Sequence, residues 1–352
     1  MLLVAVALAV AAGGTAPDPE APDVPRAAHT ATLLASGDVL VAGGCTVDSC
    51  ELDARGATTE IYDMESRRFH DGPQLLRPRV GHAAVRLEDE SILVFGGWDR
   101  SSQTASAERW RPGADRFEPA ASMSAPRGGF TVTKLRDGRV LVVGGSDKGR
   151  ALRSAELYDP ADERFVTTGS MRVARDSHTA TLLPDGRVLV AGGGAEGEGV
   201  FASVEIWSPR TGRFTSAAPL LERRHKHAAV AVREGVLVVG GSDERDFSGR
   251  RSSAELYRPD QRRWVRVGPL SAPRFKLGDA IVALPGGGAL VVGGGPRADR
   301  YDPRTRRFRP VAGSGRTLSF STATRLRDGG ILVVGGYDDR IVLAGGARLL
   351  YP

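Results

Sequence analysis

Apolar runs that end in a pair of glycines recur along the whole chain and dominate its hydrophobic pattern. Seven of them occur, and their glycine pairs stand at residues 43–44, 96–97, 144–145, 192–193, 240–241, 293–294 and 335–336. Successive pairs are 42 to 53 residues apart, and three of the six intervals are 48 residues. A fixed period of this size is typical of stacked supersecondary units. The pattern therefore predicts one unit repeated seven times.

Each unit contains four short runs that predict four strands, here strands a to d in chain order. Strand a begins 13 or 14 residues before the glycine pair, at His29, His82, Phe130, His178, His227, Asp279 and Ser321. A break such as PDG, RDG or SGD, typical of a hairpin turn, separates it from strand b, which ends at the glycines. A variable loop leads to strand c, as in TEIYD, and a turn rich in Pro, Asp and Arg leads to the aromatic of strand d. Runs this short leave no room for a helix, so each unit is predicted to be an antiparallel four-stranded sheet.

Seven such sheets around an axis form a β-propeller, which protects its strand edges by radial repetition. The glycine pair, the Glu two residues before Tyr or Trp on strand c, and the aromatic that follows on strand d resemble the kelch motif. The resemblance covers residues 26–352 and extends to exported bacterial members of the galactose-oxidase-like propeller superfamily. It implies an all-β, seven-bladed kelch-type propeller with four-stranded antiparallel blades.

The seventh unit reaches the end of the sequence after three strands. Its strands a and b lie at about 321–336, its strand c lies at about 347–351, and Pro352 follows. The last blade is therefore predicted to lack its own strand d. Part of residues 15–25 would fill the place if it ran along the outer edge, where proline is tolerated. Otherwise the blade stays three-stranded, and the sequence leaves both arrangements open.

The N-terminal region predicts export. Residues 1–13 have the features of a signal peptide, because MLLVAVALAVAA is apolar, uncharged and too short to span a bilayer. Residues 14–25 are expected to form a Pro-rich segment and residues 26–352 the propeller, with no membrane span in the mature chain. The two cysteines, Cys45 and Cys50, share one loop, and a disulfide between them suits an oxidising compartment. The expected location is secreted, periplasmic or at the cell surface.

The charge pattern argues against a nucleic-acid partner. The chain has 48 Lys and Arg residues, of which four are Lys and 44 are Arg, and its formal net charge is +6. Basic residues are spread over every unit among Asp and Glu, whereas nucleic-acid binding favours a clustered basic stripe with exposed aromatics.

Side chains that often carry catalysis recur from unit to unit, which favours structural roles. Four of the six His residues begin strand a, whereas a catalytic site needs one such group and not one per blade; His70 and His225 are expected to be loop residues. An Arg recurs before strand a, at Arg26, Arg79, Arg127, Arg175, Arg224 and Arg274. An acidic residue recurs on strand c, at Glu60, Glu108, Glu156, Glu205, Glu255 and Asp299. Because a guanidinium pairs well with a carboxylate, these residues are predicted to tie neighbouring blades together. The alternative is that the Arg residues form a ring around the pore mouth and bind an anionic ligand.

No cofactor or metal is expected, and an enzyme is the second choice. Galactose oxidase, which some kelch-like propellers resemble, binds copper through two Tyr, two His and a Cys linked to one of the Tyr. Here both cysteines lie in one loop, and five of the six Tyr occupy the repeated strand c position. The alternative function is an exported, sugar-epimerase-like enzyme that modifies carbohydrates, which would need an acid/base pair in the central mouth.

The main prediction is a non-catalytic binding module. Antiparallel order places the b–c loops and the d–a segments on one rim, and variable loops on a rigid scaffold are where recognition usually occurs. The candidate ligand-binding residues on this rim are Trp98, Arg100, Phe201, Phe247, Arg250, Arg251 and Tyr337. The expected partner is a protein or a glycan at the cell surface, and the protein is expected to be a monomer.

Overall fold

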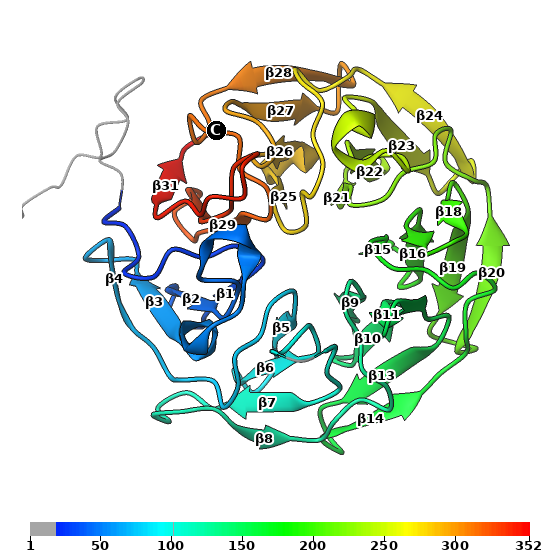
Figure 1. The fold of residues 1–352 in the computed structure, drawn as a ribbon. Coiled ribbons are helices and arrows are strands. Elements are labelled where there is room, and N and C mark those ends of the chain that lie inside the picture. The colour runs from blue at the N-terminus through cyan, green and yellow to red at the C-terminus, as the bar shows by residue number, and fades with distance from the viewer. Residues whose placement is uncertain (1–18, 101) are drawn as a thin grey trace, which may run out of the picture.

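The chain folds into a ring of seven β-sheets around a central axis (Figure 1). The computed structural model describes residues 19–100 and 102–352. The strands of each sheet run antiparallel, and strand a is the innermost (Figure 1). The predicted all-β, seven-bladed propeller is confirmed, and the sheets are numbered here as blades 1 to 7 in chain order.

The strand bounds follow the repeat. The a strands are β1 (Thr30–Leu33), β5 (Ala83–Arg86), β9 (Thr131–Lys134), β15 (Thr179–Leu182), β21 (Ala228–Val232), β25 (Ile281–Ala283) and β29 (Thr322–Arg325). The b strands are β2 (Val39–Ala42), β6 (Ile92–Phe95), β10 (Val140–Val143), β16 (Val188–Ala191), β22 (Gly235–Val239), β26 (Ala289–Val291) and β30 (Ile331–Val334). The c strands are β3 (Thr59–Asp63), β7 (Ala107–Trp110), β13 (Ala155–Asp159), β19 (Val204–Ser208), β23 (Ala254–Arg258), β27 (Ala298–Asp302) and β31 (Ala347–Leu350). The d strands are β4 (Arg68–Asp71), β8 (Glu118–Ala120), β14 (Arg164–Thr167), β20 (Arg213–Ala217), β24 (Arg263–Val267) and β28 (Arg307–Val311).

The remaining elements are short and lie in connections. Four 3-10 turns occur in the described residues, namely η1 (Asp48–Cys50), η2 (Ala54–Ala57), η3 (Asp246–Gly249) and η4 (Pro285–Gly287). Two small hairpins lie in the b–c loops of blades 3 and 4, formed by β11 (Ser146–Asp147) with β12 (Arg150–Ala151) and by β17 (Gly194–Ala195) with β18 (Gly199–Val200).

The hydrophobic core lies between successive blades. Every residue of the b strands is buried, because both faces of each strand are covered by a neighbouring sheet. Leu141 and Val143 of blade 3, for example, pack in one cluster with Val190 and Trp207 of blade 4. This explains why strand b reads as a continuous apolar run and not as an alternating one.

The glycine pairs allow neighbouring blades to approach closely. The second glycine of blade 1, Gly44, has a φ of +94°, and a Cβ there would lie 2.6 Å from the Ala27 carbonyl oxygen. Its N–H donates to the Arg79 carbonyl at the start of blade 2 (2.7 Å). Equivalent bonds join all seven blade interfaces, including Gly336 of blade 7 to the Arg26 carbonyl of blade 1 (2.9 Å). The repeated glycines are therefore a condition of ring closure.

The recurrent histidines link neighbouring a strands. Each is buried, and its Nε2 bonds to a threonine hydroxyl of the preceding blade. The four pairs are His29–Thr322 (3.0 Å), His82–Thr30 (3.0 Å), His178–Thr131 (2.8 Å) and His227–Thr179 (2.9 Å). Burial is the main cause that lowers the pKa of His82 and His178 to about 3, and it holds the pKa of His29 and His227 well below its usual range. These rings are therefore neutral parts of the scaffold.

Blade 6 departs from the repeat at the start of its a strand. Asp279 holds the register position of the histidines, but two extra residues separate it from Arg274. Leu277 is buried and fills the space that a histidine ring fills in other blades. The first glycine of the preceding blade shows this: a Cβ on Gly144 would meet the His178 ring, and a Cβ on Gly240 would meet the Leu277 side chain. Asp279 itself is exposed.

Blade 7 has three strands, in the order β29-β30-β31. The described part of the N-terminal segment, residues 19–25, contains no strand and contacts blade 1. The Asp23 N–H donates to Glu60 Oε1 (2.6 Å), and Glu20 pairs with Arg68 (3.3 Å). Closure of the ring follows from the blade 7 to blade 1 contacts above. Residues 15–18, which the closure hypothesis also includes, lie outside the described residues, as does the predicted signal peptide.

Cys45 and Cys50 form a disulfide in the b–c loop of blade 1, with 4.9 Å between their Cα atoms. Cys45 is buried and packs near Ala27 and Tyr337, so the bridge anchors the loop to the inner part of the ring. In the described part of the chain, no helix is long and apolar enough to cross a membrane.

Candidate functional site

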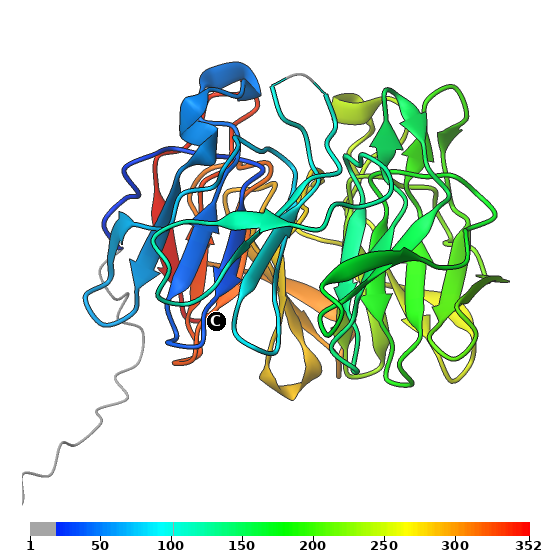
Figure 2. The ribbon, with the colours of Figure 1, turned by 90° about the horizontal axis from the view of Figure 1, so that it is seen from below.

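The two faces of the propeller differ in their connections. One face, uppermost in Figure 2, carries the b–c loops with η1, η2, η3 and the two small hairpins. The opposite face carries the shorter a–b and c–d turns, such as the five residues between β9 and β10. Loops of varied length on a repetitive scaffold are typical of a recognition surface. This loop-bearing face is therefore the candidate functional surface.

A ring of seven residues surrounds the axial mouth on this face. Each stands two residues before the first residue of strand a, or lies in the equivalent turn of blade 6, and all have a positive φ between 50° and 62°. They are Ala28, Gly81, Gly129, Ser177, Lys226, Lys276 and Phe320. Backbone hydrogen bonds of 2.8 to 3.1 Å join the members in sequence from Gly129 round to Gly81, as from the Lys276 N–H to the Lys226 carbonyl (2.8 Å). We call these residues the mouth ring.

Five members of the mouth ring are not glycine, although a left-handed conformation is unfavourable for other residues. Such strain persists where the surrounding structure enforces it and is enriched at functional sites. The three large members, Lys226, Lys276 and Phe320, are adjacent and belong to blades 5, 6 and 7. The mouth therefore has a small-residue side and a basic, aromatic side.

Aromatic and basic side chains gather on that second side, around Lys276. Its ammonium nitrogen lies 4.4 to 5.9 Å from the centroids of four rings, those of Phe247, Phe275, Tyr337 and Phe320. It also donates a hydrogen bond to the Tyr337 hydroxyl (3.1 Å). Distances of this size are typical of cation–π contacts. We call these five residues and Arg250 the mouth cluster.

Arg250 completes the outer edge of the mouth cluster. Its guanidinium carbon lies 4.8 Å from the Phe275 centroid and 5.1 Å from that of Phe247, and it pairs with Asp339 of blade 7 (2.8 Å). Phe275 is buried, whereas Phe247 is 40% exposed. The cluster thus presents an exposed ring and a cation on a well-packed base.

Several charged side chains lie close to one another beside the cluster. Asp246 pairs with Lys226 (2.9 Å) and lies 3.6 Å from the His225 ring. Burial, aided by Lys226, lowers the pKa of Lys276, and burial raises the pKa of Tyr337 to about 12. At neutral pH the Tyr337 hydroxyl is therefore protonated.

The structure brings three of the seven predicted rim residues together in the mouth cluster, namely Phe247, Arg250 and Tyr337. The other four lie apart. Trp98 of blade 2 packs over Gly128, Arg100 is exposed in the same loop, and Phe201 of blade 4 stacks under the Arg175 guanidinium (5.7 Å). Arg251 points into blade 5, where it pairs with Glu222 (3.0 Å) and Asp243 (3.5 Å).

Sequence reasoning did not find Phe275, Lys276 and Phe320. These residues lie in the d–a segments. The repeat pattern shows these segments only as connections leading into strand a, whereas the predicted binding residues lie in the variable b–c loops. One signal was present in the composition, because Lys226 and Lys276 are two of only four lysines in the chain.

The recurrent Arg and acidic residues form six buried ion pairs, one in each of blades 1 to 6. The pairs are Arg26–Glu60 (2.6 Å), Arg79–Glu108 (2.8 Å), Arg127–Glu156 (2.8 Å), Arg175–Glu205 (3.3 Å), Arg224–Glu255 (2.7 Å) and Arg274–Asp299 (2.5 Å). Each joins the incoming d–a segment to strand c of the same blade, so it fixes the crossover rather than linking two sheets. The guanidinium also donates to backbone carbonyls, as Arg127 does to Gly144 (2.8 Å) and Ser154 (3.1 Å).

Comparisons with known proteins agree with this architecture. The family model described as Kelch motif matches residues 78–124, 135–172 and 223–271. An F-box/kelch-repeat protein of Arabidopsis thaliana is 31% identical over 75 residues, which is 21% of this chain and only 16% of that protein. A fungal alcohol oxidase of the AA5 family, solved in complex with copper, is 18% identical with a TM-score of 0.75 and covers 97% of this chain and 76% of its own. At this identity the likeness to the oxidase shows the fold alone.

The side chains present do not fit a copper site of the galactose-oxidase type. Both cysteines are joined in the disulfide, and four histidines are buried against threonine hydroxyls. Within the described residues, no group of three or more His, Cys, Asp or Glu side chains is placed to hold a metal ion.

The matched segments coincide with blades 2, 3 and 5, and the remaining blades repeat the same strands, glycine pairs and crossover contacts. Such a fold supports a binding or protein-interaction module. The chain is a seven-bladed β-propeller that contains kelch motifs.

Proposed function

We propose that the protein is an exported, non-catalytic binding module that recognises a protein or a glycan through the loop-bearing face. The mouth cluster carries the proposal. Its residues come from blades 5, 6 and 7, so the closed ring brings together groups that are up to 90 residues apart in sequence. Aromatic rings and Arg are typical anchors of recognition surfaces.

The cluster suits partners that combine a flat apolar face with polar groups. The exposed face of Phe247 offers a stacking surface, and Arg250 beside it offers guanidinium donors. A sugar ring or an aromatic side chain of a partner has the shape to stack here. Lys276 and Tyr337 lie beneath and hold the cluster in one geometry, which limits the entropy lost on binding.

The disulfide supports the exported setting, because disulfides persist in oxidising compartments and are rare in the cytosol. The expectation of a cell-surface partner rests on the same ground. A monomer is proposed, since the repeated contacts close the ring within one chain.

The test uses the mature wild-type protein, a Phe247→Ala/Arg250→Ala variant and a control variant, Val166→Ala/Arg164→Ala. The control removes an exposed apolar side chain and an exposed Arg from β14, away from the mouth. A glycan array and a pull-down from surface extracts identify ligands, whose affinities are then measured by calorimetry. The cluster variant is expected to weaken binding at least tenfold with little change in thermal midpoint, and the control is expected to bind like wild type.

Equal binding by the cluster variant and the wild type would remove the mouth cluster from recognition. Turnover of a bound sugar by the wild type would favour the alternative, a carbohydrate-modifying enzyme, over a pure binding module.

A further inference from the structure

Blade 7 lacks the buried ion pair that the other six blades share. Arg348 of β31 holds the place that Glu156 has in blade 3. Val333 and Val142 are equivalent residues of strand b, and on strand c Val333 pairs with Arg348 whereas Val142 pairs with Glu156. Leu318 holds the place of the crossover Arg, because its carbonyl accepts the N–H of Gly294 as the crossover Arg carbonyls accept those of the other second glycines. The carboxylate is thus replaced by a cation, and the guanidinium by an apolar side chain.

A pocket of about 220 Å³ lies where the pair would be. Its wall includes Leu318 and Arg348, together with Gly335 and Gly346. In blade 3 the residues at the positions of Gly335 and Gly346 are Gly144 and Ser154, whose carbonyls accept hydrogen bonds from Arg127. Gly346 borders open space, as a Cβ there would meet no atom within 4 Å. The pocket is therefore the position that a side-chain pair fills elsewhere in the ring.

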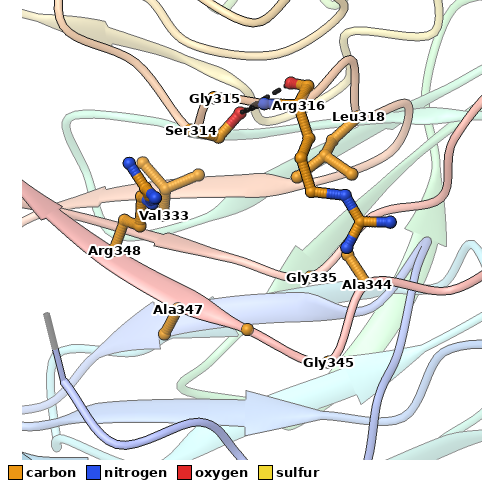
Figure 3. A pocket seen from close by; sticks show the side chains of 11 residues that line it. Ser314, Gly315, Arg316, Leu318, Val333, Gly335, Ala344, Gly345, Ala347 and Arg348 are labelled. Carbon is orange, nitrogen blue, oxygen red and sulfur yellow. Dashed lines mark hydrogen bonds between the residues drawn. The ribbon is translucent and has the colours of Figure 1, made fainter.

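Two guanidinium groups border this pocket. Figure 3 shows Arg348 reaching it from β31 and Arg316 from the d–a segment. Arg348 donates to the Gly313 carbonyl (3.3 Å), and Arg316 lies 4.0 Å from Asp338. Both are exposed, so a ligand in solution can approach them.

A backbone donor of the pocket also lacks the partner that it has in other blades. In blade 3 the Ser124 N–H donates to the Glu156 carboxylate (2.7 Å). The Arg316 N–H holds the equivalent place, because the Gly315 N–H before it donates to Pro296 as the Met123 N–H before Ser124 donates to Ala105. Among the described residues the Arg316 N–H donates to the Ser314 hydroxyl, at 3.3 Å (Figure 3). Of the two donors that receive a carboxylate in six blades, the backbone N–H therefore remains in the seventh, where Leu318 replaces the crossover Arg and Arg348 occupies the strand position of the carboxylate.

We propose that this blade 7 pocket binds a carboxylate group carried on a small apolar body. Two arginines supply the planar, charge-assisted donors that carboxylates prefer, and they oppose a cationic ligand. Leu318, Val333, Ala344 and Ala347 supply an apolar wall. The volume is below the range typical of drug-sized ligands, which limits the body to roughly one ring. The pocket is separate from the mouth cluster, and this inference does not depend on the proposed function.

The test compares benzoate with benzamide, which has the same shape without the charge, by calorimetry on the full mature chain. Benzoate is expected to bind at least tenfold more tightly than benzamide. Leu318→Arg/Arg348→Glu rebuilds the ion pair of the other blades, and it is expected to abolish benzoate binding while keeping or raising the thermal midpoint. Gly346→Leu, which fills the pocket without changing charge, is expected to abolish it as well. Arg304→Glu, a charge reversal on an exposed turn of blade 6, is expected to bind like wild type.

A second pair of probes separates the two sources of a carboxylate. Binding of acetyl-Gly-Glu-Gly-amide, but not of its Gln counterpart, would identify an acidic side chain of a partner, and binding of benzoate alone would identify a free acid. Equal affinity for benzoate and benzamide would overturn the proposal. So would unchanged benzoate binding in either pocket-filling variant.

Discussion

Glu156 accepts hydrogen bonds from both the Arg127 guanidinium and the Ser124 N–H while it is almost completely buried. A buried carboxylate is costly unless it is paired and fully hydrogen-bonded. Here one oxygen faces the cation and the other faces the backbone of the crossover. Loss of the carboxylate would therefore leave a buried guanidinium without its counter-charge and a backbone donor without its acceptor.

Glu156→Ala is expected to lower the free energy of unfolding by about 3–5 kcal/mol, because breaking a buried pair leaves an uncompensated charge. Glu118→Ala, whose side chain is 64% exposed in a surface pair with Arg111, is expected to change it by less than about 1 kcal/mol. Urea unfolding of the two variants measures the difference. Similar losses of unfolding free energy in both variants would show that the buried pair stabilises the protein no more than a surface pair does.

At this scale the sequence predicted which residues recur but not all of their geometry. The Arg and Glu positions were found because repetition exposes them, yet their contact within one blade depends on how the crossover folds back onto strand c. Asp279 shows another limit, since counting from the glycine pair placed it with the histidines. Because two residues are inserted before Asp279, Leu277 occupies the buried space instead. Counting residues along the chain cannot show which side chain points into the core.

Among the elements, the a strands are connected by side chains as well as by packing. His178 at the start of blade 4 bonds to Thr131 on β9 of blade 3 (2.8 Å), and its other ring nitrogen has no partner within the described residues. The imidazole therefore relies on a single hydroxyl. Strand boundaries followed from the repeat, whereas this link between strands did not, because it joins residues 47 positions apart.

Thr131→Val is expected to lower the free energy of unfolding by about 1–3 kcal/mol, since it leaves a buried ring nitrogen without a partner. Thr167→Val, on the exposed side of β14, is expected to have an effect within about 0.5 kcal/mol. Thermal and urea unfolding of both variants test the comparison. An equal, small effect would mean that the histidine link adds little to blade packing.

The b–c loop of blade 1 is closed by Cys45 and Cys50. Intact mass after alkylation of the exported protein is expected to show no free thiol, and two after reduction. Because the loop is short, reduction is expected to cost only about 2 kcal/mol of stability. Two alkylated thiols without prior reduction would contradict the bridge.

Considered as a whole molecule, the ring contains four buried histidines at interfaces between successive blades. Their folded-state pKa lies below that of the unfolded chain, so at moderately acidic pH the unfolded chain binds more protons. Their contribution to stability is complete above pH 6.5 and is lost as the pH falls toward about 3. Acid should therefore weaken several interfaces together.

The free energy of unfolding is expected to fall between pH 6.5 and 4, with each buried histidine adding about 1.4 kcal/mol per pH unit. His178→Phe introduces the residue type that blade 3 has at this position, Phe130, and is expected to reduce the slope. His70 lies on strand β4 and not in a loop as the sequence predicted. His70→Gln, a change at this exposed site, is expected to keep the slope. Urea unfolding at several pH values measures all three slopes, and identical slopes would exclude the buried rings as the cause.

The mouth ring would make recognition at the proposed binding face modular. Its members are held by backbone hydrogen bonds and a shared left-handed turn, so the side chain at each position is free to vary without altering the closure of the ring. Blades 1 to 4 leave their positions small, and blades 5 to 7 carry Lys226, Lys276 and Phe320. A ligand bound at this opening, as proposed above, would therefore contact mainly one flank of it, off the axis. Seven independently replaceable positions around one opening would let a new specificity arise blade by blade, by single substitutions that leave the scaffold in place.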